Sequence, residues 1–289
     1  MNIAETIKDT RAMAEDWKRQ RYSIGFVPTM GFLHAGHISL IEKARKENDR
    51  VVVSIFVNPI QFGPNEDFSK YPRDMNRDLK MCKQTGVDLV FVPQVQEMYP
   101  IINLAYVDIE ALGENLCGAK RPNHFRGVCT VVTKLFHIIT PDRAYFGEKD
   151  AQQLAIIQRM TQDLSFPIEI VPCPIVREPD GLAMSSRNSY LSSEERSAAL
   201  VIPRSLAKAR RMLLQGEKDA EVIRHIIEEE ISREPLARID YVDVVDACTL
   251  NWIDKIQGPV LTAVAVYIGK TRLIDNFSFK EECTCCSQC

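Results

Sequence analysis

The sequence predicts an α/β fold in which a parallel β-sheet is covered by helices on both faces and is followed by a smaller α+β region. Short runs of β-branched or aromatic residues alternate with longer segments of helical period up to about residue 176. The most apolar run, VVVSIFV, is typical of a central strand that is buried on both faces. After residue 176 the alternation ends, and this change predicts a domain boundary.

The first domain is predicted to comprise residues 1–176 and to form a doubly wound sheet. Its first strand is expected at YSIGFVPT, which makes a β–α–β unit with the helix and the strand that follow. In chain order the expected elements are a strand at 22–29, a helix at 35–48, a strand at 51–57, a helix at 74–86, a strand at 87–93, a helix at 126–140, a strand at 142–146, a helix at 151–164 and a strand at 168–174.

The second domain is predicted to comprise residues 177–280 and to be a small α+β unit. Two helical stretches precede a strand, and a hairpin-like pair of strands follows around Gly269 and Lys270. The expected elements are helices at 194–216 and 220–232 and strands at 239–247, 259–269 and 271–279.

The composition is that of an ordinary globular protein, and it limits the function classes. Of 289 residues, 45% are hydrophobic and 26% are charged, and the net charge of −3 leaves no excess of Lys or Arg to bind nucleic acid. The start, MNIAETIKDTRAMAEDWKRQ, lacks the apolar core of a signal peptide, and no run is long enough to cross a membrane. We expect a cytoplasmic protein whose nine cysteines are reduced.

The last nine residues, 281–289, differ in composition from the rest of the chain. Cys283, Cys285, Cys286 and Cys289 lie in the run CTCCSQC. A structural zinc site normally takes its two cysteine pairs from separated segments, so a disordered tail with reduced thiols is expected. A tail that handles Zn²⁺ or Cu(I), or that acts in redox chemistry, is the alternative.

In an open parallel sheet ligands bind beyond the carboxyl ends of the strands, so the polar loops there are candidate sites. PTMGFLHAGH places His34 and His37 three apart at a helix start, where free N–H groups and the helix dipole favour an anion. Gly36 would let a ligand approach the backbone, and two imidazole donors suit a triphosphate. Alternatively, one histidine caps the helix and the other lies on the surface. A zinc site is a weaker alternative, because no third ligand is evident.

The loop at residues 58–74 follows the most apolar strand. Asn58 and Gln61 are neutral amides that can hydrogen-bond hydroxyl and carboxylate oxygens. This pair fits a small polyhydroxy or hydroxy-acid ligand. An ordinary polar surface loop is the alternative.

A third loop, FGEKDAQQ, gathers Gly147, Lys149, Asp150 and Gln153 at the next helix start. Lysine suits a phosphate, and a nearby carboxylate can order a ribose hydroxyl or a hydrated Mg²⁺. A surface cluster of charges is the alternative reading of this loop.

A fourth loop, DGLAMSSRNSYLS, precedes a helix. Ser185, Ser186 and Arg187 could form a compact phosphate cradle. A serine-rich linker that contains a helix cap is the alternative.

These motifs together resemble a known family. HAGH resembles the H-x-G-H signature of the nucleotidylyltransferase and class I aminoacyl-tRNA synthetase superfamily, and MSSRN resembles its second phosphate-binding motif, K-M-S-K-S. With FVNPIQF, RPNHFRGV and FGEKDAQQ between them in order, the chain resembles the pantothenate synthetases, or pantoate–β-alanine ligases. The resemblance extends to about residue 280 and implies a Rossmann-like fold whose C-terminal domain acts as a lid.

The resemblance implies that the enzyme condenses pantoate with β-alanine, using ATP and Mg²⁺, to give pantothenate, AMP and pyrophosphate. Pantoate would first form a pantoyl adenylate, which the amine of β-alanine then attacks. This reaction belongs to pantothenate biosynthesis and the coenzyme A pathway. The resemblance also implies a homodimer, with small molecules rather than nucleic acid or membrane as partners.

The resemblance assigns the candidate residues to five groups. Those implied to contact ATP are Met30, His34, His37, Gly147, Lys149, Asp150, Ser185, Ser186 and Arg187. The catalytic ones, which act on the phosphates, are His34, His37, Lys149, Ser185, Ser186 and Arg187. Those implied for pantoate are Gln61, Gln153, Met30 and Asn58, and those for the β-alanine region are Arg121, His124 and Tyr71. Asp78 is implied for Mg²⁺, although Asn76 and Arg77 stand where some relatives have acids.

Two functions of other classes compete with the ligase. A nucleotidylyltransferase would share H-x-G-H but leave AMP on its product, and FVNPIQF and RPNHFRGV argue against it. A catalytically silent binding protein would be expected to lack His34, His37 or Lys149, and all three are present. A tRNA synthetase fragment is least favoured, because a basic anticodon-binding domain is missing.

Overall fold

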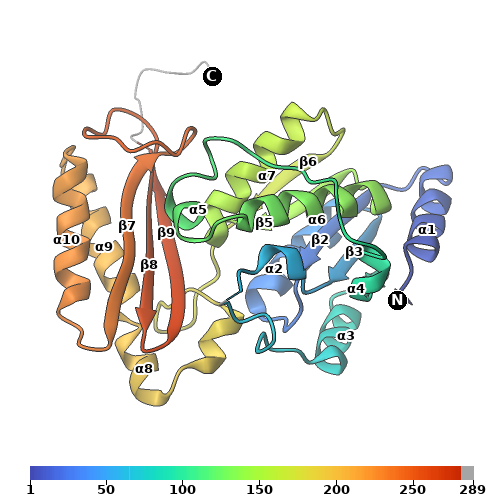
Figure 1. The fold of residues 1–289 in the computed structure, drawn as a ribbon, viewed down its shortest axis with the longest axis horizontal. Coiled ribbons are helices and arrows are strands. Elements are labelled where there is room, and N and C mark those ends of the chain that lie inside the picture. The colour runs from blue at the N-terminus through green and yellow to red at the C-terminus, as the bar shows by residue number, and fades with distance from the viewer. Residues whose placement is uncertain (65, 281–289) are drawn as a thin grey trace. The chain divides into compact units, whose positions relative to one another are not determined.

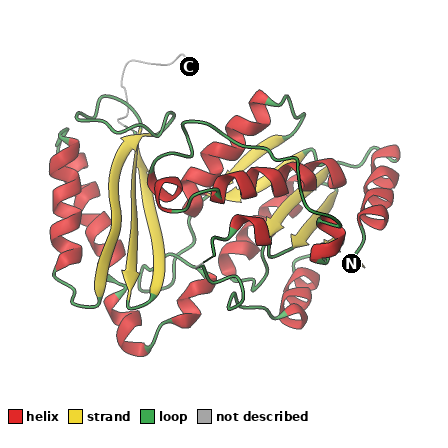
Figure 2. Ribbon diagram, in the orientation of Figure 1, coloured by secondary structure: helices red, strands yellow, loops and turns green. Residues whose placement is uncertain are grey.

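The structure is a computed structural model that describes residues 1–64 and 66–280 (Figures 1 and 2). The chain divides into two compact units. The first contains Met1–Val176 together with Met184–Ser186, and the second contains Arg177–Ala183 and the chain from Arg187 onwards. The predicted cysteine-rich tail lies outside the described residues.

The first unit is built on a sheet of six parallel strands in the order β1-β4-β3-β2-β5-β6, which confirms the predicted Rossmann-like, doubly wound sheet. Its strands are β1 (Asn2–Ala4), β2 (Ile24–Thr29), β3 (Arg50–Ile55), β4 (Leu89–Phe91), β5 (Arg143–Gly147) and β6 (Glu169–Cys173). The expectation that the strand at 22–29 is the first was wrong, because β1 precedes it and pairs with β4. Three residues are too few to show a strand period.

Helices cover both faces of this sheet (Figure 1). They are α1 (Ile7–Arg19), α2 (Ala35–Glu47), α3 (Met75–Gln84), α6 (His124–Ile139) and α7 (Ala151–Asp163), with short helices α4 (Val95–Met98), α5 (Leu116–Lys120), η1 (Pro59–Gln61) and η2 (Glu148–Asp150). Successive strand residues point to opposite faces. On β2, Val27 packs in one cluster with Ile41 of α2, whereas Phe26 meets Phe136 of α6 edge to face at 6.5 Å.

The carboxyl ends of β2, β3 and β5 lie at the same edge of the sheet, because these strands are parallel neighbours. The chain leaves β2 towards β3 on one side, whereas β5 lies on the other side. This reversal of strand order is where open α/β sheets bind ligands. The loops after β2, β3 and β5 are the ones that the sequence singles out.

The second unit contains a three-stranded antiparallel sheet and helices on one of its faces, as the α+β prediction requires. Its elements are η3 (Ser186–Tyr190), α8 (Ser193–Ala198), α9 (Val201–Leu214), α10 (Ala220–Ser232), β7 (Ala237–Asp246), β8 (Val260–Ile268) and β9 (Thr271–Phe279). The predicted helix at 194–216 is interrupted after Ala198, close to Pro203. Proline lacks the N–H that an uninterrupted helix would use there.

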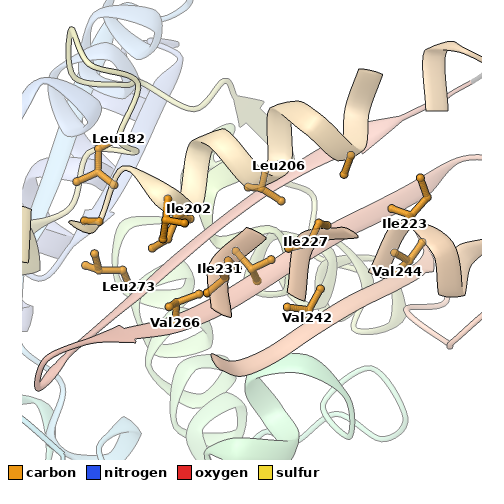
Figure 3. Packing of buried hydrophobic residues seen from close by; sticks show 14 of the residues in the cluster. Leu182, Ile202, Leu206, Ile223, Ile227, Ile231, Val242, Val244, Val266 and Leu273 are labelled. Atoms are coloured by element: carbon orange, nitrogen blue, oxygen red, sulfur yellow. The ribbon is translucent and has the colours of Figure 1, made fainter. Parts of the chain in front are cut away.

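The core of the second unit forms between its helices and its sheet (Figure 3). Leu206 of α9 and Ile227 of α10 pack against Val242 and Val244 of β7 and Val266 of β8. Val242 and Val244 are two positions apart on β7, so their side chains lie on the same face of the sheet. No helix among the described residues is long and apolar enough to cross a membrane.

Candidate active site

The loop between β2 and α2 carries the two histidines of the H-x-G-H motif, and both cap the helix. His34 is the N-cap of α2, and its Nδ1 accepts a hydrogen bond from the N–H of Gly36 at 3.2 Å. The N–H of His34 in turn donates to Nδ1 of His37 at 3.3 Å, and the two ring centroids are 4.1 Å apart. Because each Nδ1 accepts, the ring proton of each lies on Nε2. Both histidines therefore cap the start of α2, and the donor of each ring is its Nε2–H.

His37 is held in its neutral form. Burial, the adjacent His34 and the positive charge of Lys149 lower the pKa of His37 to about 3. At neutral pH this ring is therefore a hydrogen-bond donor without a positive charge. The loop after β5 lies beside the loop after β2 because β2 and β5 are paired parallel strands.

The start of α2 differs from the prediction in two details. Free N–H groups were expected here, but those of His34 and Gly36 are already used by the two rings. The space beside Gly36 is filled by protein, because a Cβ there would lie 2.9 Å from Cε1 of His34. The backbone N–H groups of His34 and Gly36 are therefore not available to an anion.

The loop after β5 supplies a cation next to the histidines. The side chain of Lys149 is 19% exposed, and its Nζ lies 3.9 Å from the half-exposed carboxylate of Asp150, at the limit of an ion pair. At Gly147 a Cβ would meet no atom within 4 Å, so there is open space beside the end of β5. Lys149, His34 and His37 together can direct several N–H donors at phosphate oxygens.

The loop after β3 forms a network of neutral polar groups. Asn58, only 1% exposed, donates to Oε1 of Gln61 at 3.1 Å and accepts from the hydroxyl of Tyr99 at 2.9 Å. The Gln61 amide contacts the sulfur of Met30 at 3.2 Å, which joins this network to the β2–α2 loop. The structure thus brings Met30, Asn58 and Gln61 together, as three of the four residues assigned to pantoate require.

Helix α6 packs directly on the backbone of η1. A Cβ on Gly127 would lie 2.6 Å from Cα of Gln61 and 2.8 Å from its nitrogen, so a side chain cannot be accommodated. The carbonyl of Gly127 also accepts from the Asn58 amide at 3.1 Å. This close approach fixes the position of Gln61.

The two adjacent glutamines of α7 have different surroundings. Gln152 is buried, and its amide donates to the carbonyls of Leu112 and Asn115, each at 2.8 Å. No hydrogen bond to the side chain of Gln153 is found among the described residues. Gln152 therefore holds the preceding loop.

Two of the residues assigned to the β-alanine region, His124 and Arg121, are linked to Gln61 in series. His124 is paired through Nδ1 with the carbonyl of Gln61 at 2.8 Å and through Nε2 with Arg121 at 2.9 Å. Since a carbonyl only accepts, Nδ1 carries the proton and Nε2 accepts from the guanidinium. Burial and the charge of Arg121 lower the pKa of His124 to about 4. The backbone of Tyr71 accepts from Arg73 at 2.9 Å.

Arg121 forms a bidentate ion pair with a carboxylate that the sequence did not single out. Its Nε and Nη2 contact the two oxygens of Glu66 at 2.7 and 2.5 Å. Burial raises the pKa of Glu66, but the hydrogen bonds and charge of Arg121 outweigh burial, and the net shift is downward. Arg121 is thus arranged to bind a carboxylate.

The serine loop reaches the β2–α2 loop within the first unit. The hydroxyl of Ser186 donates to the carbonyl of Phe32 at 3.3 Å. Ser185 belongs to the same unit, whereas Arg187 belongs to the second unit. Ser186 thus ties this motif to the β2–α2 loop.

Asp78 does not fit the expected role of a magnesium ligand. Its carboxylate is 1% exposed, and it accepts the backbone N–H groups of Phe32 and Leu33, both at 2.7 Å. Burial raises the pKa of Asp78, and this outweighs the effect of the two hydrogen bonds. Mg²⁺ usually keeps several waters, for which this position leaves no room. Among residues 1–64 and 66–280, no group of three or more His, Cys, Asp or Glu side chains could hold a metal ion.

Sequence reasoning missed two residues with a place in this site and the structural role of a third. Tyr99 holds Asn58, Glu66 holds Arg121, and Asp78 holds the β2–α2 loop. Tyr99 and Glu66 carry no local signal, because their partners are 41 and 55 residues away. Buried carboxylates are rare unless they are paired, but burial is not visible in a sequence.

A family model and curated relatives name the same enzyme family. A family model described as pantoate-beta-alanine ligase matches residues 2–278. A pantothenate synthetase of Clostridium botulinum (strain Loch Maree) is 59% identical over 280 residues, which are 97% of this chain and 100% of that protein. One from Clostridium acetobutylicum is 58% identical over 279 residues, covering 96% of this chain and 99% of that protein.

Solved structures agree. The crystal structure of pantothenate synthetase from Thermus thermophilus superimposes with a TM-score of 0.91 at 46% identity and covers 96% of this chain and 99% of that chain. A pantoate-beta-alanine ligase from Francisella tularensis, complexed with beta-gamma ATP and beta-alanine, gives a TM-score of 0.78 at 38% identity. That comparison covers 96% of this chain and 97% of the other.

Proposed function

The chain belongs to the pantoate–β-alanine ligase family, and from this premise we propose how its residues carry out the reaction. The protein is an enzyme that condenses pantoate with β-alanine to pantothenate, using ATP. A carboxylate has no usable leaving group, and ATP supplies one. The reaction therefore proceeds through a pantoyl adenylate.

In the first step the carboxylate of pantoate attacks the α-phosphorus of ATP and pyrophosphate leaves. His34, His37 and Lys149 donate to the phosphate oxygens as negative charge moves to the departing pyrophosphate. One observation carries this assignment: each Nδ1 is used as a helix cap, so each neutral ring has its proton on Nε2, and the charge of Lys149 acts on His37. The groups that hold the helix thereby orient the donors.

The neutral state of His37 has a consequence for its role. With a pKa of about 3, the His37 ring carries one proton, on Nε2, and no second proton at neutral pH. Its contribution is an oriented dipole rather than proton transfer to the leaving group. The positive charge in this part of the site comes from Lys149.

Pantoate lies against the neutral network of Gln61 and Asn58, with Met30 beside it and Gln153 opposite. Amides bind hydroxyl and carboxylate oxygens without neutralising the carboxylate. The nucleophile therefore keeps its charge for the attack on phosphorus. The network supports this role because Tyr99 and Gly127 already fix Asn58.

In the second step the amine of β-alanine attacks the carbonyl of the adenylate, and AMP leaves. Arg121 binds the carboxylate of β-alanine, and His124 orients Arg121 through Nε2. The Francisella tularensis relative was crystallised with β-alanine, which supports a β-alanine site in this family. Tyr71 lies in the same loop as Glu66 and contributes to the wall of this region.

The remaining nucleotide contacts are assigned by motif. Ser185 and Ser186 bind phosphate oxygens, and Ser186 is supported by its bond to Phe32. Arg187 is assigned by its place in MSSRN alone. Gly147 and Asp150 contact the nucleoside, for which the open space beside Gly147 leaves room.

Mg²⁺ binds together with ATP, and Asp78 is not one of its ligands. Phosphate oxygens and water commonly supply most of its ligands. Both oxygens of Asp78 are already used by backbone N–H groups. No step of the mechanism above is assigned to a protein-bound metal.

The exchange of labelled pyrophosphate into ATP tests the adenylate. Exchange is expected with pantoate and Mg²⁺ alone, and release of AMP in step with pantothenate only when β-alanine is added. Exchange without any AMP release would point to a nucleotidylyltransferase. No exchange and no AMP under any combination would favour a silent binding protein.

The chain forms a homodimer. Ile101, Ile102 and Leu104 are 80, 84 and 88% exposed in one segment after α4, and exposed apolar groups of this kind favour burial against a second copy. Sedimentation velocity is expected to give a dimer for the wild-type chain and a monomer for Ile102→Asp with Leu104→Asp. A wild-type monomer at every concentration would contradict this proposal.

A further inference from the structure

We propose that Asp78 is a positioning residue for adenylate formation, because it fixes the turn from which His34 and Ser186 take their places. The inference rests on the phosphate role proposed above for the two histidines. It assigns to Asp78 a function other than metal binding. Three features of the molecule support this role: the bonds that Asp78 makes, the conformation of the turn, and the groups that the turn holds.

Asp78 holds two consecutive backbone N–H groups from a segment 46 and 45 residues earlier. Oδ2 accepts from Phe32 and Oδ1 from Leu33, both at 2.7 Å. Hydrogen bonds to a charged acceptor are about twice as strong as neutral ones. Since each oxygen holds a different N–H, the carboxylate cannot rotate without losing one of them.

The turn needs such an anchor because its backbone is unfavourable on its own. Gly31 has φ +83° and Phe32 has φ +50°, both in the left-handed region that a phenylalanine rarely adopts. The turn also lies against the carboxylate itself. A Cβ on Gly31 would be 3.0 Å from Oδ2 of Asp78 and 2.9 Å from Ile55.

Four consecutive N–H groups of the turn have acceptors in the protein. Gly31 donates to the hydroxyl of Thr29 at 3.1 Å, Phe32 and Leu33 donate to Asp78, and His34 donates to His37. The turn is therefore held along its whole length, and Asp78 supplies the two central acceptors. Loss of these acceptors would release the segment that begins α2.

The turn also positions two phosphate-binding groups. His34 follows Leu33 directly, and its ring orientation depends on the start of α2. The carbonyl of Phe32 accepts from Ser186, so one residue is tied to Asp78 by its N–H and to the serine loop by its C=O. A shift of Phe32 would move both loops together.

The test compares Asp78→Asn with a control on the same helix. Asparagine keeps the shape and one acceptor, but its NH₂ group faces the second N–H. The control is Asp74→Asn, because Asp74 is exposed and accepts the N–H of Arg77 at 3.0 Å as the N-cap of α3. Any effect that comes only from the loss of one negative charge near the start of α3 should appear in both variants.

Two readouts are expected to change in Asp78→Asn and not in Asp74→Asn. Pyrophosphate exchange with pantoate falls by on the order of 100-fold per folded molecule, as expected when reacting groups are misplaced by about 1 Å. The KM for β-alanine changes little. Hydrogen–deuterium exchange of peptides within residues 29–40, measured without ligands, becomes faster.

Three results would overturn the proposal. Wild-type exchange in Asp78→Asn would do so, and so would equal losses in both variants that track the folded fraction. A third is an activity of Asp78→Asn that is restored by excess Mg²⁺ while hydrogen–deuterium exchange stays normal, since that would identify a metal ligand. An inactive wild-type enzyme would sink the proposed function instead, and the hydrogen–deuterium result would still test the turn.

A second variant covers the case in which Asp78→Asn does not fold. Thr29→Val removes the acceptor for Gly31 and leaves Asp78 in place. It is expected to lower pyrophosphate exchange by roughly 10-fold, in proportion to the loss of one neutral hydrogen bond. Unchanged exchange in Thr29→Val would show that the anchoring of the turn does not matter, and the proposal would fall.

Discussion

Replacing His34 by asparagine separates the two roles that the structure gives to this residue. The Oδ1 of asparagine can take the place of the imidazole Nδ1 and accept from the N–H of Gly36, which His34 holds at 3.2 Å. Asparagine has nothing equivalent to Nε2. The substitution therefore keeps the helix cap and removes the proposed phosphate donor.

The two roles differ in magnitude. Asparagine is among the best N-cap residues, so the free energy of unfolding should change by less than about 0.5 kcal/mol, whereas His34→Ala should lose about 1 kcal/mol. Removal of one preorganised donor to developing charge typically lowers kcat by about 10²–10³, equivalent to about 2.7–4 kcal/mol. Both variants should show this loss of rate, and only alanine should show the loss of stability.

Urea unfolding and pyrophosphate exchange measure the two quantities independently. His225→Asn is the matched control, because His225 is an exposed residue of α10 in the second unit, and it should leave both quantities unchanged. If His34→Asn exchanged pyrophosphate at the wild-type rate, His34 would be a helix cap and nothing more. A large loss of stability in His34→Asn would refute the assignment of Nδ1 as the capping atom.

Three further predictions concern other residues of the site. The pKa of His37 is about 3 in the folded protein and 6.5 in the unfolded chain. As the pH falls below 6.5, the His37 imidazole is therefore protonated in the unfolded chain but not in the folded protein. The free energy of unfolding should then drop between pH 7.5 and 5 by about 2 kcal/mol more in the wild type than in His37→Asn, as urea titrations at the two pH values can check. Gly127→Ala should displace the backbone of Gln61, which lies 2.6 Å from the new Cβ, and raise the Kd of pantoate in calorimetry by about 10-fold or more. Glu66 competes with the carboxylate of β-alanine for the Arg121 guanidinium, so Glu66→Gln should lower the KM of β-alanine about 3- to 10-fold in steady-state assays. A higher KM would mean that Glu66 orients Arg121 for the substrate.

Much of the fold could be predicted because its signals are local. The strands β2, β3 and β5 are five or six residues long and mostly apolar, and the hairpin around Gly269 has a turn signal between two strands. The strand β1 was missed because three residues become a strand only through pairing with β4. The break between α8 and α9 had a signal in Pro203, which a long helical period concealed.

The candidate site was predictable in its residues but not in its connections. The histidine pair, Gln61 and Lys149 stand in motifs that can be recognised within a few positions. The use of each Nδ1 as a cap depends on ring orientation, which a sequence does not contain. Asp78 was expected at a metal because the family resemblance implied it, whereas its partners are N–H groups 45 and 46 residues away.

The capping geometry of the two histidines also restricts what an inhibitor can be. With both Nδ1 atoms turned to the backbone, the rings offer N–H edges to the site and no lone pair. A compound that places acceptors such as sulfonyl, carboxylate or phosphonate oxygens there finds matching donors. A compound with an amine or amide N–H at the same point would have to turn an imidazole and break the start of α2. Selection of acceptor-rich scaffolds thus follows from how one helix begins.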